Sequence, residues 1–130
     1  MRVQLHDNTK KVWRGVVRLL LVLTVLVGGG HGAKAQLNTD AVMVIGRNAL
    51  YYEDYALSIQ YFNQIISAKP HLYLPYYYRA IAKYYLGDYV GAIDDCTMSV
   101  ERDPYIVEVY RLRAINYIRV EDYEDASKDY

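Results

Sequence analysis

One short pattern returns every 34 residues, and it constrains the fold more than any other feature of the chain. Its three copies are Glu53-Asp54-Tyr55, Gly87-Asp88-Tyr89 and Glu121-Asp122-Tyr123. Proline also recurs at this spacing, as Pro70 and Pro104. A fixed period of this length is typical of a stack of similar units, and such stacks usually present a binding surface rather than carry out catalysis.

Each unit is predicted to be a pair of helices joined by a tight turn. Apolar residues such as Val42, Ile45 and Ala49 follow helical spacing up to the repeated turn, and a second helical pattern follows it. Proline ends this second segment, because it disfavours helix at the preceding residue and cannot donate a backbone hydrogen bond. The aspartate of each turn is expected to cap the second helix, where a carboxylate accepts hydrogen bonds from free backbone N–H groups.

Small residues recur at one position of each helix of the pair. In the first helices they are Gly46, Ala80 and Ala114, and in the second helices they are Ser58, Ala92 and Ala126. A larger side chain at either position would push the helices apart, so this recurrence predicts close antiparallel packing. The recurrent tyrosines Tyr55, Tyr89 and Tyr123 open the second helices and are expected to pack across each pair.

The pattern resembles the tetratricopeptide repeat (TPR) family over residues 39–130. The matching positions are Val42, Ile45, Gly46, Ala49, Tyr55, Ser58, Phe62, Ile65, Pro70, Tyr76, Ala80, Tyr89, Ala92, Cys96, Ser99, Pro104, Tyr110, Ala114, Tyr117, Tyr123 and Ala126. Arg79, Lys83 and Arg113 depart from the family pattern, because they occupy sites that are usually apolar. The resemblance implies an all-α, right-handed solenoid of antiparallel helix pairs with about two and a half to three repeats. Repeat 1 would span residues 39–72, repeat 2 residues 73–106, and an incomplete repeat 3 residues 107–130.

The first 35 residues have the character of a targeting segment. Basic residues between Lys10 and Arg18 precede the apolar run from Leu19 to Val27, and Ala33-Lys34-Ala35 follows it. This order is typical of a secretory signal peptide, here cleaved after Ala35. The alternative is an uncleaved anchor over residues 16–30, although the run is short of the ~20 apolar residues of a spanning helix. With the resemblance, the segment predicts an exported bacterial protein, periplasmic or outer-membrane-associated, or anchored in the inner membrane.

The remaining residues argue against catalysis and against nucleic-acid binding. Residues 36–130 carry nine basic and fourteen acidic side chains, a balance that does not suit a phosphate backbone. They show no zinc-ligand spacing, no phosphate loop and no nucleophile with a plausible histidine base, so we expect no enzyme activity, cofactor or metal. Cys96 is the only cysteine, so an internal disulfide is excluded and a buried thiol is expected.

By resemblance, the first helix of each unit lines a concave, peptide-binding wall. The candidate groove residues are Met43, Arg47, Tyr51, Tyr77, Ile81, Tyr84, Tyr85, Arg111 and Arg119. Four apolar residues are expected to line the same wall: Leu50, Leu74, Ile115 and Ile118. Tyrosine combines a large contact area with a hydroxyl group, and arginine can pair with acidic groups of a ligand. Two alternatives stay open: the tyrosines serve packing, and Arg111, Arg113 and Arg119 are solvated or paired with Glu108 and the acidic residues 121–125.

One function known in the TPR family, binding the acidic tail of cytosolic chaperones, is disfavoured. That function uses a clamp of lysines, asparagines and arginine, and the corresponding residues here are Met43, Arg47, Tyr78, Glu108 and Leu112. Arg47 alone could take part, and Glu108 would repel an acidic tail.

The sequence therefore predicts a non-catalytic scaffold of the cell envelope that binds an extended peptide or a partner protein in a Tyr-rich groove. The alternative is the N-terminal repeat region of a larger envelope protein or enzyme whose active domain lies beyond residue 130. Tyr130 falls within the second helix of the third unit, so we expect the start of a longer protein or a truncated gene product. Self-association through the incomplete third repeat is a further expectation, and membrane contact is expected only through an uncleaved N-terminal segment.

Overall fold

All regular structure between residues 37 and 130 is α-helical. The computed structural model describes Val12 and residues 37–130, so the predicted targeting segment lies outside the described residues apart from Val12. The helices are α2 (Thr39–Tyr51), α3 (Tyr55–Ala68), α4 (Leu74–Tyr85), α5 (Tyr89–Arg102), α6 (Val107–Arg119) and α7 (Tyr123–Asp129). The all-α prediction is confirmed. In this part of the chain, none of the helices has both the length and the apolar character needed to cross a bilayer.

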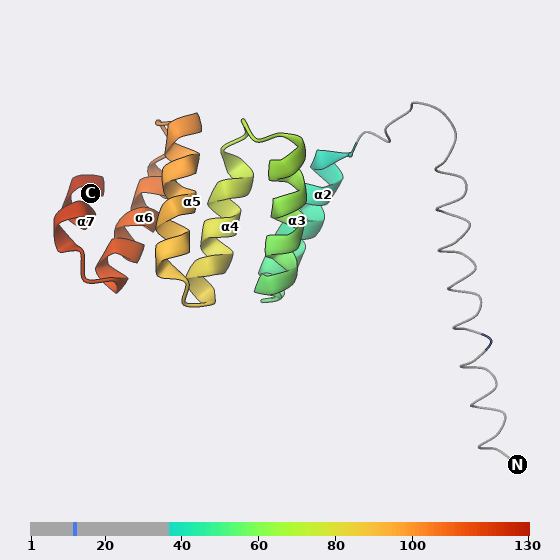
Figure 1. Cartoon of the computed structure of the whole chain (residues 1–130), viewed down its shortest axis with the longest axis horizontal. Coiled ribbons are helices and arrows are strands. Elements are labelled where there is room, and N and C mark those ends of the chain that lie inside the picture. Colours follow the sequence, from blue (N-terminus) through green and yellow to red (C-terminus); the bar gives the residue numbers. More distant parts are fainter. Residues whose placement is uncertain (1–11, 13–36) are drawn as a thin grey trace, which may run out of the picture. The chain divides into compact units, whose positions relative to one another are not determined.

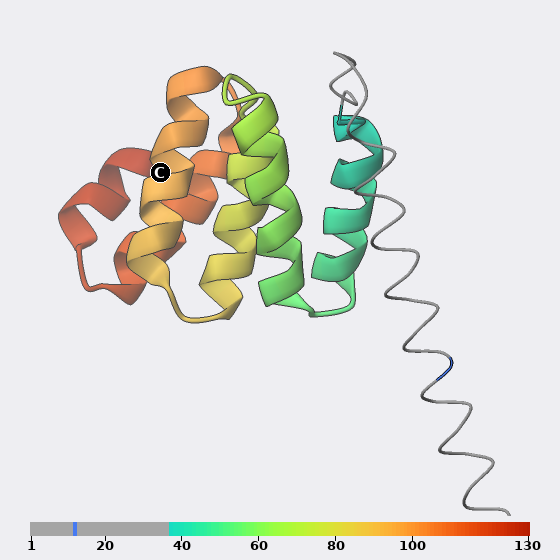
Figure 2. The same ribbon diagram turned by 45° about the vertical axis from the view of Figure 1, so that its right-hand side comes forward.

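The helices stand side by side, and the connections between them alternate between two edges (Figure 1). Each helix packs against the next one along the chain. The first helices of successive pairs also touch, α2 with α4 and α4 with α6, and the turned view in Figure 2 shows the same order. This arrangement confirms a solenoid of antiparallel helix pairs, in which each pair contacts only its neighbours.

The repeated turn has the same hydrogen-bonded geometry in all three copies. In the first, the backbone N–H of Asp54 donates to the carbonyl of Ala49 at 2.9 Å, which closes the end of α2 in a Schellman arrangement. The carboxylate of Asp54 then accepts from the N–H of Leu57 at 3.2 Å and opens α3. Equivalent caps at Asp88 and Asp122 measure 2.9 Å and 3.1 Å, so the capping prediction is confirmed.

The turn also requires one residue with left-handed backbone geometry. Gly87 supplies it at φ 80°, whereas Glu53 and Glu121 adopt φ 63° at the equivalent positions. Glycine takes this conformation without strain, but a residue with a Cβ atom adopts it at a cost. Two of the three turns are therefore strained at one residue.

The small residues lie where helices approach most closely. All six are buried: Gly46, Ala80, Ala114, Ser58, Ala92 and Ala126. At Gly46, a Cβ atom would lie 2.8 Å from the ring of Phe62, which is itself fully buried. The predicted close packing is confirmed, and it depends on this absence of side-chain volume.

Two arginines at usually apolar sites are held in buried ion pairs. Arg79 donates to the carboxylate of Asp95 on α5, with Nε to Oδ2 at 2.8 Å, and Lys83 reaches the same group at 2.9 Å. One period later, Arg113 forms a two-pronged pair with Asp129, with both bonds at 2.7 Å. The alternative that Arg113 pairs with Glu108 or with residues 121–125 is therefore wrong, because its guanidinium pairs with Asp129 of the neighbouring helix α7. The hydrogen bonds that Arg113 donates to the Asp129 carboxylate raise the pKa of Arg113.

The same arginines connect successive pairs. Arg79 also donates to Asn63 of α3 at 2.7 Å, and Arg113 donates to Thr97 of α5 at 3.2 Å. Each guanidinium thus bridges the second helix of its own pair and that of the pair before. The side chain of Asp95 is almost fully buried, and it has two cationic partners, Arg79 and Lys83.

The expectation that the repeated tyrosines pack across each pair is confirmed at Tyr89, whereas Tyr55 stacks on the first helix of the next pair and Tyr123 is exposed. Tyr55 stacks on Tyr85, with ring centroids 5.0 Å apart, and Tyr89 packs against Tyr84 at 5.8 Å. Tyr123, by contrast, is 64% exposed. Tyr55 and Tyr89 are covered by rings of α4, and no described helix follows α7 to cover Tyr123 in a similar way.

Candidate functional site

The nine candidate groove residues lie on the first helices of the three pairs, and none of them is buried. Met43, Arg47 and Tyr51 lie on α2; Tyr77, Ile81, Tyr84 and Tyr85 lie on α4; Arg111 and Arg119 lie on α6. The three arginines, Tyr51 and Tyr85 are exposed, and the other four are half-buried. The fold therefore keeps all nine side chains accessible across three neighbouring helices.

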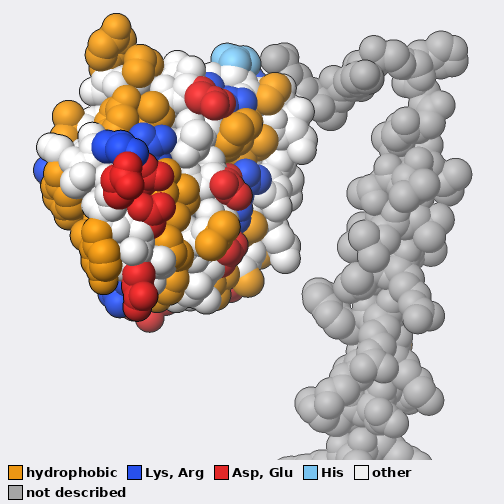
Figure 3. Space-filling view, turned by 60° about the vertical axis from the view of Figure 1, so that its left-hand side comes forward, with side chains coloured by type: hydrophobic (Ala, Val, Ile, Leu, Met, Phe, Trp, Pro, Cys, Tyr) orange, Lys and Arg blue, Asp and Glu red, His pale blue; other side chains and the backbone are white. Residues whose placement is uncertain are grey.

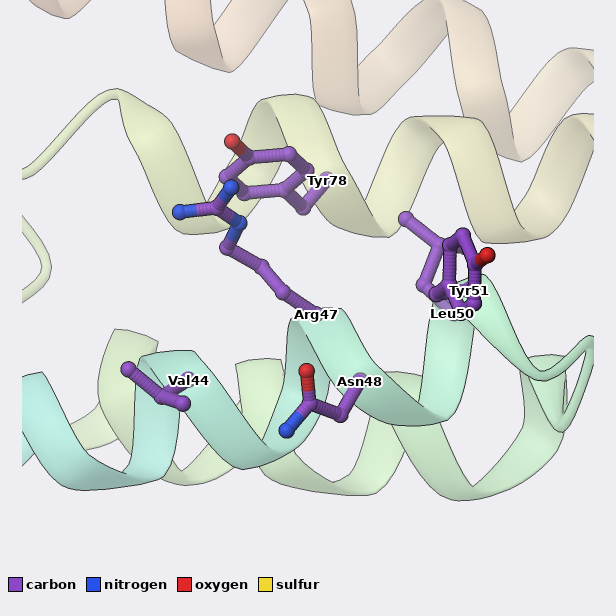
Figure 4. Close-up of a pocket in the computed structure, with 6 residues that line it drawn as sticks. All are labelled: Val44, Arg47, Asn48, Leu50, Tyr51 and Tyr78. Atoms are coloured by element: carbon purple, nitrogen blue, oxygen red, sulfur yellow. The ribbon is translucent and has the colours of Figure 1, made fainter.

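A hollow of about 460 Å³ joins two of these residues at the start of the solenoid. Arg47 and Tyr51 line it together with Leu50, Val44, Asn48 and Tyr78 (Figure 4). The guanidinium carbon of Arg47 lies 5.3 Å from the centre of the Tyr78 ring, a cation–π contact that leaves part of the guanidinium edge open. Tyr78 was not among the nine candidate groove residues, although the sequence places it at a position of the family's peptide clamp.

Met43 lies elsewhere. It lines a second hollow of about 320 Å³ together with Ile65, His71, Leu74, Arg102 and other residues around the loop between α3 and α4. The structure therefore does not bring Met43 into the hollow that Arg47 and Tyr51 share.

A second group of candidate residues forms an aromatic cluster beside the turn between α4 and α5. Tyr85 stacks almost parallel on Tyr55, at an angle of 7°, and its edge meets Tyr84 at 5.4 Å. Arg119 donates to the hydroxyl of Tyr84 at 3.0 Å and lies 5.8 Å from the ring of Tyr89. The hydrogen bond that Arg119 donates to the Tyr84 hydroxyl raises the pKa of Arg119. These side chains support one another, so they offer a pre-organised surface to a ligand.

Tyr77 has a mixed role. It packs against the core cluster of Ala80, Ala92, Cys96 and Val109, and so does Tyr84. Burial raises the pKa of the Tyr77 hydroxyl, the nearby carboxylate of Glu108 raises it further, and Arg111 opposes this effect. The packing alternative is therefore correct for part of the Tyr77 and Tyr84 side chains, while their remaining surface stays accessible.

The cations of the described residues differ in whether they pair with a carboxylate. The cations with carboxylate partners are Arg79, Lys83, Arg113 and Lys128. In the part of the chain that the structure describes, no ion pair involves Arg47, Arg111 or Arg119. The candidate groove thus contains three arginines that form no ion pair among the described residues, within a region that is acidic as a whole.

The described residues offer little for reaction chemistry. Within residues 37–130, no group of three or more His, Cys, Asp or Glu side chains is placed to hold a metal ion. Cys96 is fully buried, as expected, and burial raises the pKa of its thiol to about 12, so the nucleophilic thiolate is scarce near neutral pH. The arrangement suits recognition of an extended chain by stacking, hydrogen bonding and charge.

Comparison with known proteins places the fold among TPR domains. No family model and no curated protein matches the sequence. Among solved structures, the chain is similar to the first TPR of Spaghetti (RPAP3) bound to the HSP90 peptide SRMEEVD, with a TM-score of 0.70 and 20% identity over 72% of this chain and 75% of that chain. It is also similar to the TPR2B domain of yeast Sti1 in complex with an Hsp70 peptide, with a TM-score of 0.68 and 25% identity over 70% and 73% of the two chains.

A third neighbour is larger. MamA from Desulfovibrio magneticus RS-1 matches with a TM-score of 0.69 and 18% identity over 73% of this chain, but the match spans only 54% of the MamA chain. These likenesses show a TPR-like fold, and two of the neighbours were solved in complex with a chaperone peptide.

Proposed function

We propose that this protein is a non-catalytic scaffold of the cell envelope, which binds an extended segment of a partner protein across α2, α4 and α6. The observation that carries the proposal is the set of accessible tyrosines on α2 and α4, bordered by arginines of α2 and α6 that have no carboxylate partner among the described residues. Two structural neighbours were solved with peptides bound, which supports the same use of the fold here. Tyrosine contributes contact area and hydrogen bonds to such a surface, and free arginine attracts acidic or carbonyl groups.

The groove is tested with exposed residues, because substituting Tyr77 or Tyr84 would also damage the core. In the triple variant Arg47→Ala, Tyr51→Ala, Arg111→Ala, each change removes an exposed side chain, so the fold should survive. The matched control is Gln60→Ala with Gln64→Ala, two exposed positions on α3. We expect the triple variant to recover at least tenfold less of its partner from envelope extract, while the control recovers as much as the unaltered chain. Equal recovery by all three proteins would contradict the groove assignment.

The envelope location rests on the order of basic, apolar and small residues before Gln36. The test is the mass of the exported protein, which for a cleaved signal begins at Gln36. An intact N-terminus in an inner-membrane fraction would instead favour the anchor over residues 16–30, and a cytosolic intact chain would contradict both.

The ligand is proposed to differ from the chaperone tail bound by two of the neighbours. Glu108 is exposed on α6 and places a negative charge near Tyr77 and Arg111, where an acidic tail would otherwise bind. Titration with the peptide SRMEEVD should give no saturable binding in the micromolar range, and Glu108→Lys should strengthen whatever weak binding exists. Micromolar binding by the unaltered chain would contradict this proposal.

A further inference from the structure

The three repeated turns lie on one edge of the solenoid, which is the lower edge in Figure 1. We call it the turn edge, and it comprises residues 52–55, 85–90 and 118–124. Aromatic contacts connect its three turns: Tyr55 stacks on Tyr85 at 5.0 Å, and the guanidinium carbon of Arg119 lies 5.8 Å from the ring of Tyr89. The turn edge runs along the side of the stacked helix pairs, so one pair does not cover the turn of the next.

The turn edge carries exposed apolar side chains at a repeated position. Tyr52, Leu86 and Val120 directly follow the first helices, and they are 78%, 54% and 38% exposed. The backbone N–H of each donates to the carbonyl four residues earlier at 3.0–3.1 Å, so the same backbone geometry presents all three side chains. Val90, beside the second turn, is 62% exposed. The second turn has a helix pair on either side, so the exposure of Leu86 and Val90 is not an effect of the ends of the stack.

Acidic side chains share the turn edge with these apolar residues. Glu53 and Glu121 are exposed, and neither forms an ion pair among the described residues. Both hold the left-handed conformation that glycine adopts without strain, so the stability of the fold does not account for a glutamate at these positions. The charge of these two carboxylates is therefore available to a ligand.

The turn edge as a whole is negatively charged. Its residues include six carboxylates and one cation, Arg119, which donates a hydrogen bond to the hydroxyl of Tyr84. Figure 3 keeps this edge at the bottom and shows apolar side chains beside acidic ones there. The candidate groove has the opposite character, because its arginines Arg47 and Arg111 have no carboxylate partner among the described residues.

We propose that the turn edge binds a second partner, a protein segment in which lysine or arginine lies beside apolar residues. Its apolar side chains would pack on Leu86 and Val120, since clustered apolar surface commonly marks an interaction site. Its basic side chains would pair with Glu53 and Glu121, and such charge complementarity selects against acidic segments. The two surfaces would let one chain hold two chemically different partners, and either surface can fail while the other holds.

Fluorescence anisotropy with three labelled synthetic peptides tests the proposal on the chain as it is isolated from the cells that produce it. The first peptide intersperses lysine and leucine with glycine, the second has glutamate in place of lysine, and the third has serine in place of leucine. We expect the first to bind saturably and the other two to bind at least tenfold more weakly, because each lacks one half of the complementary chemistry. Added salt should weaken the first complex.

Two double variants locate the binding without touching the capping aspartates or the core. Leu86→Ser with Val120→Ser should lower the affinity for the first peptide about tenfold. Glu53→Gln with Glu121→Gln should also lower it and should reduce its dependence on salt.

The matched controls lie at exposed positions on the opposite edge, and a third control lies in the groove. They are Tyr105→Ser with Val107→Ser, Asp40→Asn with Glu101→Gln, and Arg47→Ala with Arg111→Ala. All three should bind the first peptide as tightly as the unaltered chain does.

The proposal is overturned if the first peptide does not bind, if the glutamate peptide binds equally well, or if the opposite-edge controls lose as much affinity as the turn-edge variants. A loss confined to the groove control would assign the peptide to the groove instead. Sedimentation of the chain, alone and with vesicles of phosphatidylglycerol and phosphatidylethanolamine, tests the other occupants. Self-association or vesicle binding that Leu86→Ser with Val120→Ser abolishes would assign the edge to a second copy or to a membrane, and would equally overturn the proposal.

Discussion

Cys96 lies in the core with Ala80, Ala92 and Val109, and its thiol has no contact with solvent. Burial raises the thiol pKa to about 12, although the positive charge of Arg113 acts in the opposite direction. In the unfolded chain the same thiol has its ordinary pKa of about 8.5. Between these two values the native state keeps a proton that the unfolded state has lost, so the free energy of unfolding falls as the pH rises.

This difference predicts a measurable pH dependence above pH 9. Each pH unit in this window should cost roughly 1.4 kcal/mol of stability through Cys96 alone. Urea unfolding at pH 8, 9 and 10 would measure it, with Cys96→Ala as the control that retains every tyrosine. The stability advantage of the unaltered chain over Cys96→Ala should shrink as the pH rises; an advantage that stays constant would show that the thiol is not protected.

The left-handed turn residues carry a second prediction at the scale of single residues. Glu53 and Glu121 hold a conformation that Gly87 adopts without strain. Glu53→Gly should therefore raise the free energy of unfolding by roughly 0.5–1 kcal/mol, and Gly87→Ala should lower it by about 1 kcal/mol. Chemical denaturation checks both, and Glu53→Ala separates backbone strain from side-chain effects. A gain in Glu53→Ala equal to that in Glu53→Gly would argue against strain.

Between helices, the carboxylate of Asp95 on α5 receives both Arg79 and Lys83 from α4. Removal of one member of a buried ion pair leaves its partner charges poorly solvated, at a cost of about 3–5 kcal/mol. Arg79 and Lys83 retain some solvent contact, so we expect Asp95→Ala to destabilise the protein by about 3 kcal/mol, the lower end of that range. Asp94→Ala is the matched control, because its side chain points outward from the same helix turn. A loss below ~1 kcal/mol for Asp95→Ala would mean that the ion pair adds little stability.

The helices and their caps were predictable because the repeat supplies the same information three times. The spacing of Asp54, Asp88 and Asp122 fixed the turns, and the recurrence of small residues fixed the close contacts. The ion pairs were missed, since Arg79 and Asp95 lie on different helices and the sequence of one helix does not show which residue of the other it faces. The repeat did contain a sign of these ion pairs, because Arg79 and Asp95 both recur 34 residues later, as Arg113 and Asp129.

The candidate groove was less predictable than the fold. Helical position alone placed the nine residues on the correct helices, but it could not predict how far each side chain is buried. Tyr84 packs partly against the core, whereas most of the Tyr51 side chain is exposed to solvent. The stacking of Arg47 on Tyr78 depends on the distance between α2 and α4, which the sequence of either helix does not contain.

At the scale of the whole molecule, contacts run only between neighbouring helix pairs, so stability is close to a sum of local terms. Helix α7 has seven residues, compared with fourteen in α3 and α5, and it packs on α6 alone among the described helices. Elements with few buried contacts open first. Amide hydrogen exchange should therefore be fastest in α7 and slowest in α4 and α5, which have a helix pair on each side; equal protection in α7 and α5 would contradict this.

The same lack of coverage at α7 predicts a weak and broad thermal transition for residues 36–130. A fully cooperative domain of this size would absorb roughly 0.7 kcal/mol per residue in one step with a Tm of about 45–65 °C. Here we expect the van't Hoff enthalpy to fall below the calorimetric enthalpy, because α7 unfolds before the central pairs. Scanning calorimetry provides both quantities. A sharp transition well above ~65 °C at low concentration would mean that the three pairs already form one cooperative unit.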